Sequence, residues 1–136
     1  MTDRRVGLVL VSHSRRLGEG VAELARQLSA EVPIEVAAGA EDGSLGTDAV
    51  AIGRAIERAC GEQGDREALI LVDLGSAVLS ADAASELLPP GLANRVQVAD
   101  APLVEGAVAA VVEAGLGSSL AEVRAAAESA REARKL

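Results

Sequence analysis

Residues 6–14 are Val-Gly-Leu-Val-Leu-Val-Ser-His-Ser, and this stretch decides the fold class. The run from Val6 to Val11 is continuously apolar and rich in β-branched side chains, which is typical of a strand buried on both faces of a parallel sheet. Apolar residues then recur at spacings of three and four: Leu17, Val21, Leu24, Ala25 and Leu28. This spacing predicts an amphipathic helix from Arg15 to Ala30, with Ser14 as its N-cap.

The same change from strand to helix periodicity recurs along the chain. Further strands are predicted at Ile34–Ala37, Ala68–Val72 and Val96–Ala99. Further helices are predicted from Thr47 or Asp48, over Ala81–Leu88, over Val104–Ala114, and from Ser118 or Ser119, where Glu122 completes a capping box. The alternation indicates an α/β fold, with a mostly parallel central sheet of about four strands and helices on both of its faces.

The length and composition favour one folded unit. A chain of 136 residues suits a single core, so residues 1–136 are expected to form one domain. Hydrophobic residues make up 49% and charged residues 25%, which argues against disorder and fibrous architectures. The last residues, Arg131 to Leu136, are expected to form an exposed, fraying tail.

Charge and residue usage exclude several classes of partner. The 21 acidic and 13 basic residues give a net charge of -8, which repels nucleic acid and anionic lipid. Aromatic residues are absent, so no ring can stack on a nucleobase. The apolar run at Val6 is too short for a signal peptide, and no segment has the ~20 apolar residues of a membrane helix. With Cys60 as the only cysteine, these features favour a cytoplasmic protein that binds neither nucleic acid nor membrane.

The candidate site lies where the predicted strands end. Ligands of open parallel sheets collect at the carboxyl ends of the strands. Those ends carry Ser12-His13-Ser14, Ala38-Gly39, Asp73-Leu74-Gly75-Ser76 and Asp100-Ala101-Pro102. The only histidine, His13, therefore falls at the predicted site, beside a helix start whose free amides attract phosphate.

These residue types suit phosphoryl transfer through histidine. An imidazole that attacks phosphorus must be uncharged on the attacking nitrogen, and a carboxylate bonded to the other nitrogen fixes that tautomer. We predict that His13 is the nucleophile and that Asp73 is this carboxylate. The predicted phosphate-binding residues are Ser12, Ser14, Gly39, Gly75 and Ser76.

Each of these residues also has a simpler interpretation that the sequence leaves open. A lone histidine can be a polar residue bonded to a backbone carbonyl, and Asp73 can be a helix N-cap. The glycines can be turn formers. Arg15 and Arg16 can hold a phosphoryl group or can be solvated side chains. Cys60 lies on an apolar helix face and is expected to be inert core.

Five separated motifs give the chain a family resemblance. They are VLVSHSRRLGEGV at 9–21, AAG at 37–39, GTDAV at 46–50, DLGSA at 73–77 and APLVEG at 101–106. In this order and spacing they resemble the phosphotransfer subunit of phosphoenolpyruvate-dependent dihydroxyacetone kinase, which has the mannose-type enzyme IIA fold. The match runs nearly from end to end, and the APLVEG segment distinguishes this subunit within the broader fold.

The resemblance implies a homodimer in which His13 takes a phosphoryl group from the phosphocarrier protein HPr. The group then passes to ADP in the nucleotide-binding subunit of dihydroxyacetone kinase. It also implies that Asp73 orients the imidazole and that Ala38-Gly39 and Gly75-Ser76 form the pocket. No metal or cofactor is expected in this chain, because ADP or ATP and magnesium would lie in the partner kinase subunit.

Three other functions fit part of the pattern. A mannose-type enzyme IIA would donate to the IIB protein of a sugar transporter, and the APLVEG segment argues against it. A small tetrapyrrole metal chelatase would use His13 as a ligand, and the single histidine argues against that function. A non-enzymatic anion-binding dimer would use His13 only as a hydrogen-bond donor.

Overall fold

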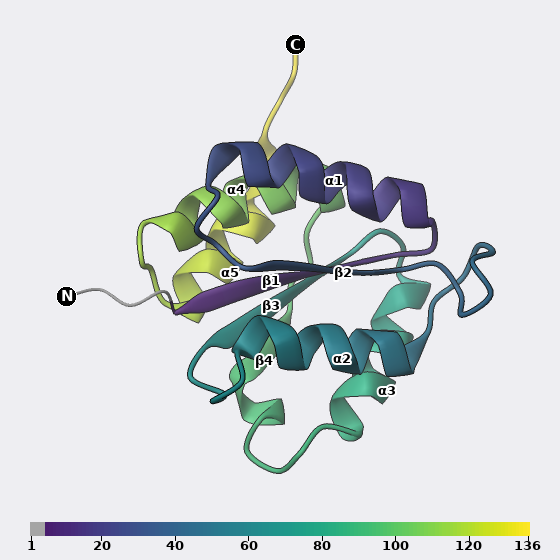
Figure 1. Ribbon diagram of the computed structural model, residues 1–136. Coiled ribbons are helices and arrows are strands. Elements are labelled where there is room, and N and C mark those ends of the chain that lie inside the picture. The colour runs from purple at the N-terminus through teal and green to yellow at the C-terminus, as the bar shows by residue number, and fades with distance from the viewer. Residues whose placement is uncertain (1–4) are drawn as a thin grey trace.

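The computed structural model describes residues 5–136 as a four-stranded parallel sheet with helices on both faces (Figure 1). The strands are β1 (Val6–Ser12), β2 (Ile34–Ala38), β3 (Glu67–Val72) and β4 (Val96–Val98). The helices are α1 (Arg15–Leu28), α2 (Ala49–Cys60), α3 (Ser76–Glu86), α4 (Leu103–Gly115) and α5 (Leu120–Ser129), with short 3-10 turns at Ala93–Arg95 and Ala130–Glu132. The predicted α/β class is confirmed. Residues 1–4 of the expected single domain lie outside the described residues.

The strand order places β1 at the centre of the sheet. The strands lie in the order β2-β1-β3-β4, and every neighbouring pair is parallel. In β1, Val11 pairs with Val72 of β3, and Ser12 pairs with Ala38 of β2. The chain runs from β1 to β2 on one side of β1 and later forms β3 on the other side of β1, so the direction of winding changes there. Such a switch point, at the carboxyl ends of the strands, is where open parallel sheets bind ligands.

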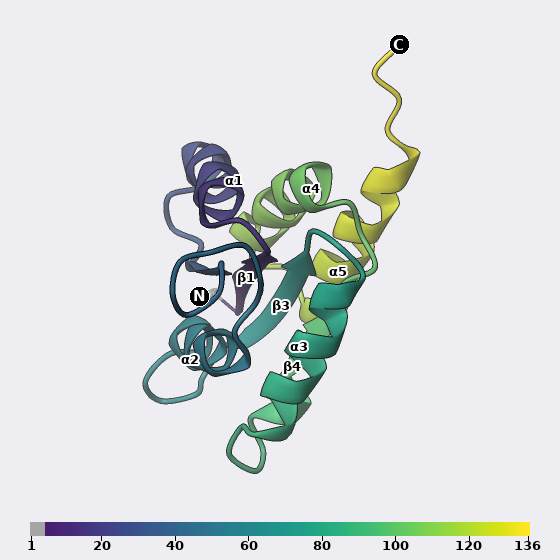
Figure 2. The ribbon, with the colours of Figure 1, turned by 90° about the vertical axis from the view of Figure 1, so that its right-hand side faces the viewer.

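Helices enclose a hydrophobic layer on each face of the sheet. Leu8 and Leu10 of β1 pack on one side with α1, α4 and α5, while Val9 and Val11 pack on the other side with α2 and α3. Figures 1 and 2 show these two helical layers above and below the strands. All four of these side chains are fully buried, which confirms the prediction of a strand covered on both faces.

The buried face of helix α1 consists mainly of small residues, and the leucines of the predicted apolar face are not on it. Val21 and Ala25 are buried as expected, but Leu17, Leu24 and Leu28 are 42–50% exposed. The buried face also contains Gly18 and Ala22. A Cβ atom at Gly18 would lie 2.8 Å from Cβ of Ala38, so the helix lies too close to β2 for leucine side chains to fit between them. The expectation for the three leucines is therefore wrong.

The helix ends show which local signals predict boundaries well. The side chains of Ser14 and Asp48 cap α1 and α2, and Ser119 forms the expected capping box with Glu122. Helix α3 differs, because it begins at Ser76 and ends at Glu86 rather than spanning Ala81–Leu88. Its N-cap is Gly75, so the alternative of Asp73 as a helix cap is wrong.

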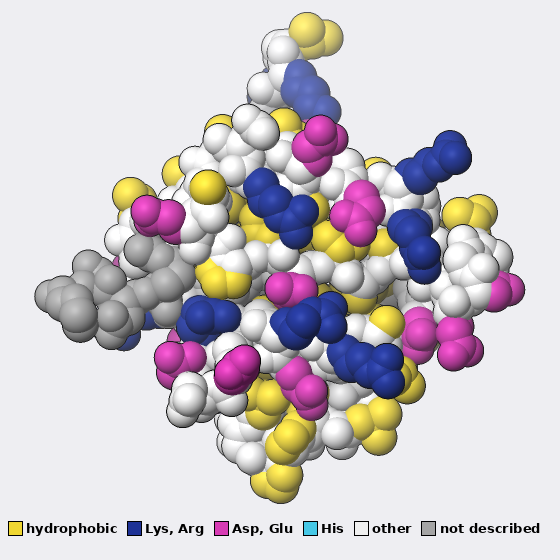
Figure 3. Space-filling view, viewed as in Figure 1, with side chains coloured by type: hydrophobic (Ala, Val, Ile, Leu, Met, Phe, Trp, Pro, Cys, Tyr) yellow, Lys and Arg dark blue, Asp and Glu magenta, His cyan; other side chains and the backbone are white. Residues whose placement is uncertain are grey.

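The surface mixes charges of both signs. Figure 3 shows Lys and Arg side chains interspersed with Asp and Glu on the face that carries β2 and α2, and the Arg58–Glu35 ion pair is one example. The residues after Ala130 are exposed, as expected for the tail, yet Lys135 pairs with Glu105. None of the helices within residues 5–136 is long and apolar enough to cross a membrane.

Candidate functional site

The two central strands bring His13 and Asp73 together. His13 follows β1 and Asp73 follows β3, and the Asp73 amide continues the strand pairing by donating to the Val11 carbonyl at 3.1 Å. The ring atom Nδ1 of His13 then lies 2.9 Å from Oδ1 of Asp73. The structure thus brings together, through backbone pairing, the two residues that the sequence singles out as nucleophile and orienting carboxylate.

The Asp73 carboxylate accepts four hydrogen bonds. Its Oδ2 accepts from the Ser12 hydroxyl at 3.0 Å and from the His13 amide at 2.8 Å. Its Oδ1 accepts from the His13 ring and, at 2.7 Å, from the Leu74 amide. Partial burial by itself raises the pKa of Asp73, but these donors outweigh burial and lower the pKa below its ordinary value. The side chain is therefore a carboxylate at neutral pH.

The carboxylate settles which ring nitrogen of His13 carries the proton. A carboxylate without a proton can only accept, so we assign the proton of the neutral imidazole to Nδ1. The lone pair then lies on Nε2, which is 3.0 Å from the Ser76 hydroxyl. The His13 side chain is 25% exposed, so Nε2 can be approached from solvent. This arrangement makes Nε2 the nucleophilic nitrogen.

Ser12 and Ser14 have different roles in the site. Ser12 is fully buried, and its hydroxyl donates to Asp73 while accepting from the Ser14 amide at 3.1 Å. Its proton is therefore not available to a phosphate, which corrects the prediction for Ser12 and makes it a support for Asp73. The Ser14 hydroxyl accepts from the Leu17 amide as the cap of α1.

The predicted glycines and Ser76 follow β2 and β3, the two strands that flank β1. Gly39 has a φ of +83°, and its amide donates to the Ser12 carbonyl at 3.0 Å, so it shapes the turn after β2. Ser76 is the first residue of α3 and Gly75 is its N-cap. The amides of Ala77 and Val78 already donate to the carbonyls of Leu74 and Gly75. The amides of Gly75 and Ser76 precede these bonds and can bind the oxygens of a phosphoryl group on Nε2.

Three helices begin around His13, on the edge that Figure 2 presents to the viewer. Helix α1 starts two residues after it, and the first residue of α3 contacts its ring. The segment before α2 is tied to it as well, because the Gly46 amide donates to the His13 carbonyl at 2.8 Å. The positive ends of helix dipoles favour an anion at this position.

Exposed leucines and arginines lie next in sequence to residues of the site. Leu74, next to Asp73, is 58% exposed, and Leu45, next to Gly46, is 80% exposed. Arg15 and Arg16 are exposed at the start of α1. Sequence reasoning missed both leucines as functional candidates, although a leucine in a loop of small and polar residues is a recognisable signal. It also missed the contact between Thr47 and Ser80, which is described below.

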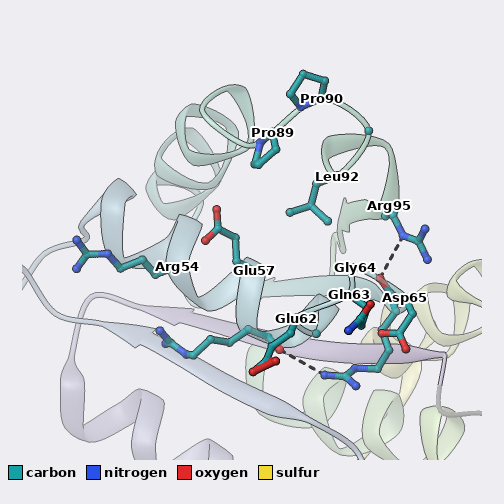
Figure 4. A pocket seen from close by; sticks show the side chains of 14 residues that line it. Arg54, Glu57, Glu62, Gln63, Gly64, Asp65, Pro89, Pro90, Leu92 and Arg95 are labelled. Atoms are coloured by element: carbon teal, nitrogen blue, oxygen red, sulfur yellow. Dashed lines mark hydrogen bonds between the residues drawn. The ribbon is translucent and has the colours of Figure 1, made fainter.

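A large pocket lies at the opposite end of the sheet from His13 (Figure 4). Its volume is about 1050 Å³, and its walls carry Arg54, Arg58, Arg66, Arg95, Glu57, Glu62 and Asp65. None of the predicted site residues lines it. Residues 5–136 also contain no cluster of three His, Cys, Asp or Glu side chains that could hold a metal ion. The arrangement of side chains that suits a chemical reaction is therefore the one around His13.

The comparison with protein families agrees with the fold. The family model of the PTS system fructose IIA component, EIIA-man, matches residues 7–124. The chain therefore belongs to the EIIA-man family of phosphotransferase-system components.

Within this family, the chain is similar to one kind of subunit in particular. It is 47% identical, over 134 residues, to the PEP-dependent dihydroxyacetone kinase phosphoryl donor subunit DhaM of Escherichia coli strain K12. That match covers 96% of this chain and 28% of the relative, so the chain spans about a quarter of that protein's length. It is also 39% identical to the phosphoryl donor subunit DhaM of dihydroxyacetone kinase 2 of Listeria innocua, covering 79% of this chain and 85% of that protein.

Solved structures share the fold. A crystal structure of an unknown function protein, EF1359, is 39% identical with a TM-score of 0.80, covering 91% of this chain and 93% of the other. A sigma-54 interaction domain protein from Enterococcus faecalis has a TM-score of 0.71 at 15% identity, covering 94% of this chain and 91% of that one. At this identity the second likeness concerns the fold alone.

Proposed function

We propose that the chain is a phosphoryl carrier that accepts and donates a phosphoryl group at Nε2 of His13. The observation that carries this proposal is the contact of His13 Nδ1 with a charged Asp73, which leaves Nε2 as the unprotonated nitrogen at the start of α3. The names of the relatives support it, since those proteins are phosphoryl donor subunits.

The transfer requires little from the protein beyond positioning and charge stabilisation. The Nε2 lone pair attacks the phosphorus of a donor phosphohistidine in line with the leaving nitrogen, the new N–P bond forms and the old one breaks. The proton stays on Nδ1, where Asp73 compensates the positive charge that the ring gains. The Ser76 hydroxyl and the backbone amides of Gly75 and Ser76 can then bind the phosphoryl oxygens. In donation, an oxygen of the acceptor attacks the phosphorus in line with Nε2, the new O–P bond forms, the N–P bond breaks, and the lone pair returns to Nε2.

The proposed donor is phosphorylated HPr, and the proposed acceptor is ADP bound in the nucleotide-binding subunit of dihydroxyacetone kinase. The imidazole is partly buried but 25% exposed, so that a second protein can reach it, as relay between two proteins requires. ADP or ATP and magnesium belong to the kinase subunit in this scheme, and this chain holds no cofactor. We further propose that the chain works in the cytoplasm as a homodimer.

Leu45 and Leu74 provide an apolar docking surface beside the imidazole, and Arg15 adds positive charge. Both partners must reach the same nitrogen, so they bind in turn at this surface. A small interface suits such brief encounters.

The direct test is to incubate the chain with enzyme I, HPr and phosphoenolpyruvate, and to measure its intact mass in neutral and acidic buffer. We expect the addition of one phosphate that is lost in acid, because phosphohistidine is acid-labile, and no addition in His13→Ala. A wild-type chain that gains no phosphate would contradict the proposal. An acid-stable phosphate, or one retained in His13→Ala, would also contradict it.

A second candidate is favoured by the family description, which names a fructose IIA component. In that case the phosphorylated chain would donate to a IIB protein of a sugar transporter. Offering the phosphorylated chain to the kinase subunit with ADP, and separately to a IIB protein, distinguishes the two. We expect loss of phosphate only to the kinase subunit; loss only to the IIB protein would establish the second candidate.

A further inference from the structure

The segment Gly46–Val50, which precedes and opens α2, has no part in the mechanism described so far. Its Thr47 makes a short contact with α3: Oγ1 of Thr47 lies 2.6 Å from Oγ of Ser80. The two residues are 33 positions apart in the sequence, and both are half-buried. This hydroxyl pair, which we call the hydroxyl latch, therefore ties the segment before α2 to α3.

Both ends of the hydroxyl latch lead to His13. On one side, the amide of Gly46, the residue before Thr47, donates to the His13 carbonyl at 2.8 Å. On the other side, Ser80 lies one helical turn after Ser76, so the two serines share a face of α3. The Ser76 hydroxyl lies 3.0 Å from Nε2 of His13. Together these contacts form a closed chain that holds His13 both at its backbone carbonyl and at Nε2.

The start of α3 is held by backbone hydrogen bonds and by the buried Ala77, but no side chain caps it. Its N-cap is Gly75, which has no side chain and makes no side-chain cap bond. Ser76 and Gly75 are both exposed, and a Cβ atom at Gly75 would meet no heavy atom within 4 Å. A helix end without a side-chain cap frays more readily than a capped one. Besides the contact of Ser76 with His13, the contact of Ser80 with Thr47 is where a side chain of another element holds this face of the helix.

We propose that Thr47 and Ser80 are positioning residues for phosphoryl transfer, because their hydroxyl pair sets the approach of Ser76 to Nε2 of His13. The inference rests on the proposed function and deepens it. With the latch intact, the Ser76 hydroxyl stays within reach of a phosphoryl oxygen on Nε2. Without it, the first turn of α3 moves away from the imidazole, phosphorylation slows, and the phosphohistidine hydrolyses sooner.

The test uses a donor that needs no partner protein. Potassium phosphoramidate transfers its phosphoryl group to histidine chemically, and labelling of the 136-residue chain is followed by intact mass and ³¹P NMR. The variants are Thr47→Val, Ser80→Ala, the double variant, and Thr47→Ser, which keeps the hydroxyl. The matched control is Ser85→Ala, because Ser85 lies on the same helix and its hydroxyl donates only to the Ala81 carbonyl.

We expect Thr47→Val and Ser80→Ala each to slow labelling by about two- to tenfold, the range that the net loss of one hydrogen bond supports. The double variant should be no slower than either single variant, since both remove the same contact. Thr47→Ser should restore the rate, and Ser85→Ala should leave it unchanged. The proposal would be overturned if Thr47→Val were labelled at the wild-type rate, or if the rate losses of the single variants added in the double variant. It would also be overturned if Ser85→Ala lost as much of the labelling rate as Ser80→Ala.

A spectroscopic measurement separates positioning from general stability. His13 is the only histidine, so a chain labelled with ¹⁵N-histidine gives one pair of ring signals. In Thr47→Val we expect the Nε2 signal to shift as the Ser76 bond weakens, while the thermal midpoint stays close to that of Ser85→Ala. An unshifted Nε2 signal would contradict the latch. This result does not depend on any partner, so failure of the wild type to accept phosphate from HPr would count against the proposed function alone.

Discussion

Asp73 Oδ1 lies 2.9 Å from Nδ1 of His13, and this contact determines which end of the imidazole can react. The carboxylate has no lone pair left for another partner, because Ser12, Leu74 and the His13 amide supply the other donors. Its position is fixed before any phosphoryl donor arrives. Preorganised groups of this kind lower a barrier without a rearrangement during the reaction.

Asp73→Asn should slow phosphorylation of His13 by about ten- to hundredfold, the range expected for a hydrogen bond to a charged group. The amide can present its oxygen to one pair of donors only, so its NH₂ group would face two further donors. The single-turnover rate with phosphorylated HPr measures the effect. Asp82→Asn, which changes an exposed aspartate of α3, is the control. Equal rates in the two variants would refute the role of Asp73.

The lowered pKa of Asp73 predicts how stability depends on pH. The folded chain holds this pKa below the ordinary value of 3.8, so the contribution of the carboxylate is complete above that value and is lost as the pH falls through the folded pKa. Urea unfolding should therefore show a difference in the free energy of unfolding between wild type and Asp73→Asn that is smaller at about pH 3 than at pH 7. A difference in unfolding free energy that stays constant or grows in acid would contradict a lowered pKa of Asp73.

Gly7→Ala should destabilise the fold by about 1–3 kcal/mol, the usual penalty of overpacking a core. A Cβ atom at Gly7 would lie 2.8 Å from the backbone oxygen of Ala59, which cannot move without shifting α2. Gly20→Ala on α1 is the matched control, since its Cβ would meet nothing within 4 Å and alanine favours a helix. Chemical denaturation measures the free energy of unfolding of both variants. If Gly7→Ala were as stable as wild type, the close packing of β1 against α2 would be contradicted.

Leu45→Ser and Leu74→Ser should raise the KM for phosphorylated HPr by about tenfold while leaving kcat within a few-fold of wild type, because a leucine buried on docking contributes about 1.5–3 kcal/mol. The control is Leu116→Ser, which changes a leucine of similar exposure, 73%, just after α4. The steady-state rate at varied HPr concentration gives both constants. If Leu116→Ser raises KM as much as Leu74→Ser does, the docking surface is misplaced.

The sequence predicted the elements whose signals are local. The buried strands at Val6 and Ala68 follow from uninterrupted apolar runs, and the caps at Ser14, Asp48 and Ser119 follow from side chains that bind nearby amides. His13 and Asp73 were singled out because both follow such strands. The strand order, which makes the two strands neighbours, depends on contacts distant in sequence and came only from the structure.

The errors have physical causes that a periodic pattern does not contain. The leucines of α1 fit an amphipathic stripe, but the close approach at Gly18 selects small residues for the buried face. Helix α3 begins earlier than predicted, because Gly75 and Ser76 suggest a loop. Ser12 was expected to face a phosphate, and its burial beneath Asp73 depends on β3 lying beside β1. Thr47 and Ser80 are joined by a contact across 33 positions, which spacing alone does not indicate.

The pairing of Val11 with Val72 in the middle of the sheet has a consequence for how the chain loses activity. His13 and Asp73 each directly follow one of these strands, so no local opening of a loop can separate their backbones while the centre of the sheet remains intact. The amide of Asp73 should exchange its hydrogen only through global unfolding, as the slowest amides of a domain do. Reactivity at the imidazole should then disappear at the same denaturant concentration as the fold itself, with no inactive but folded intermediate between them.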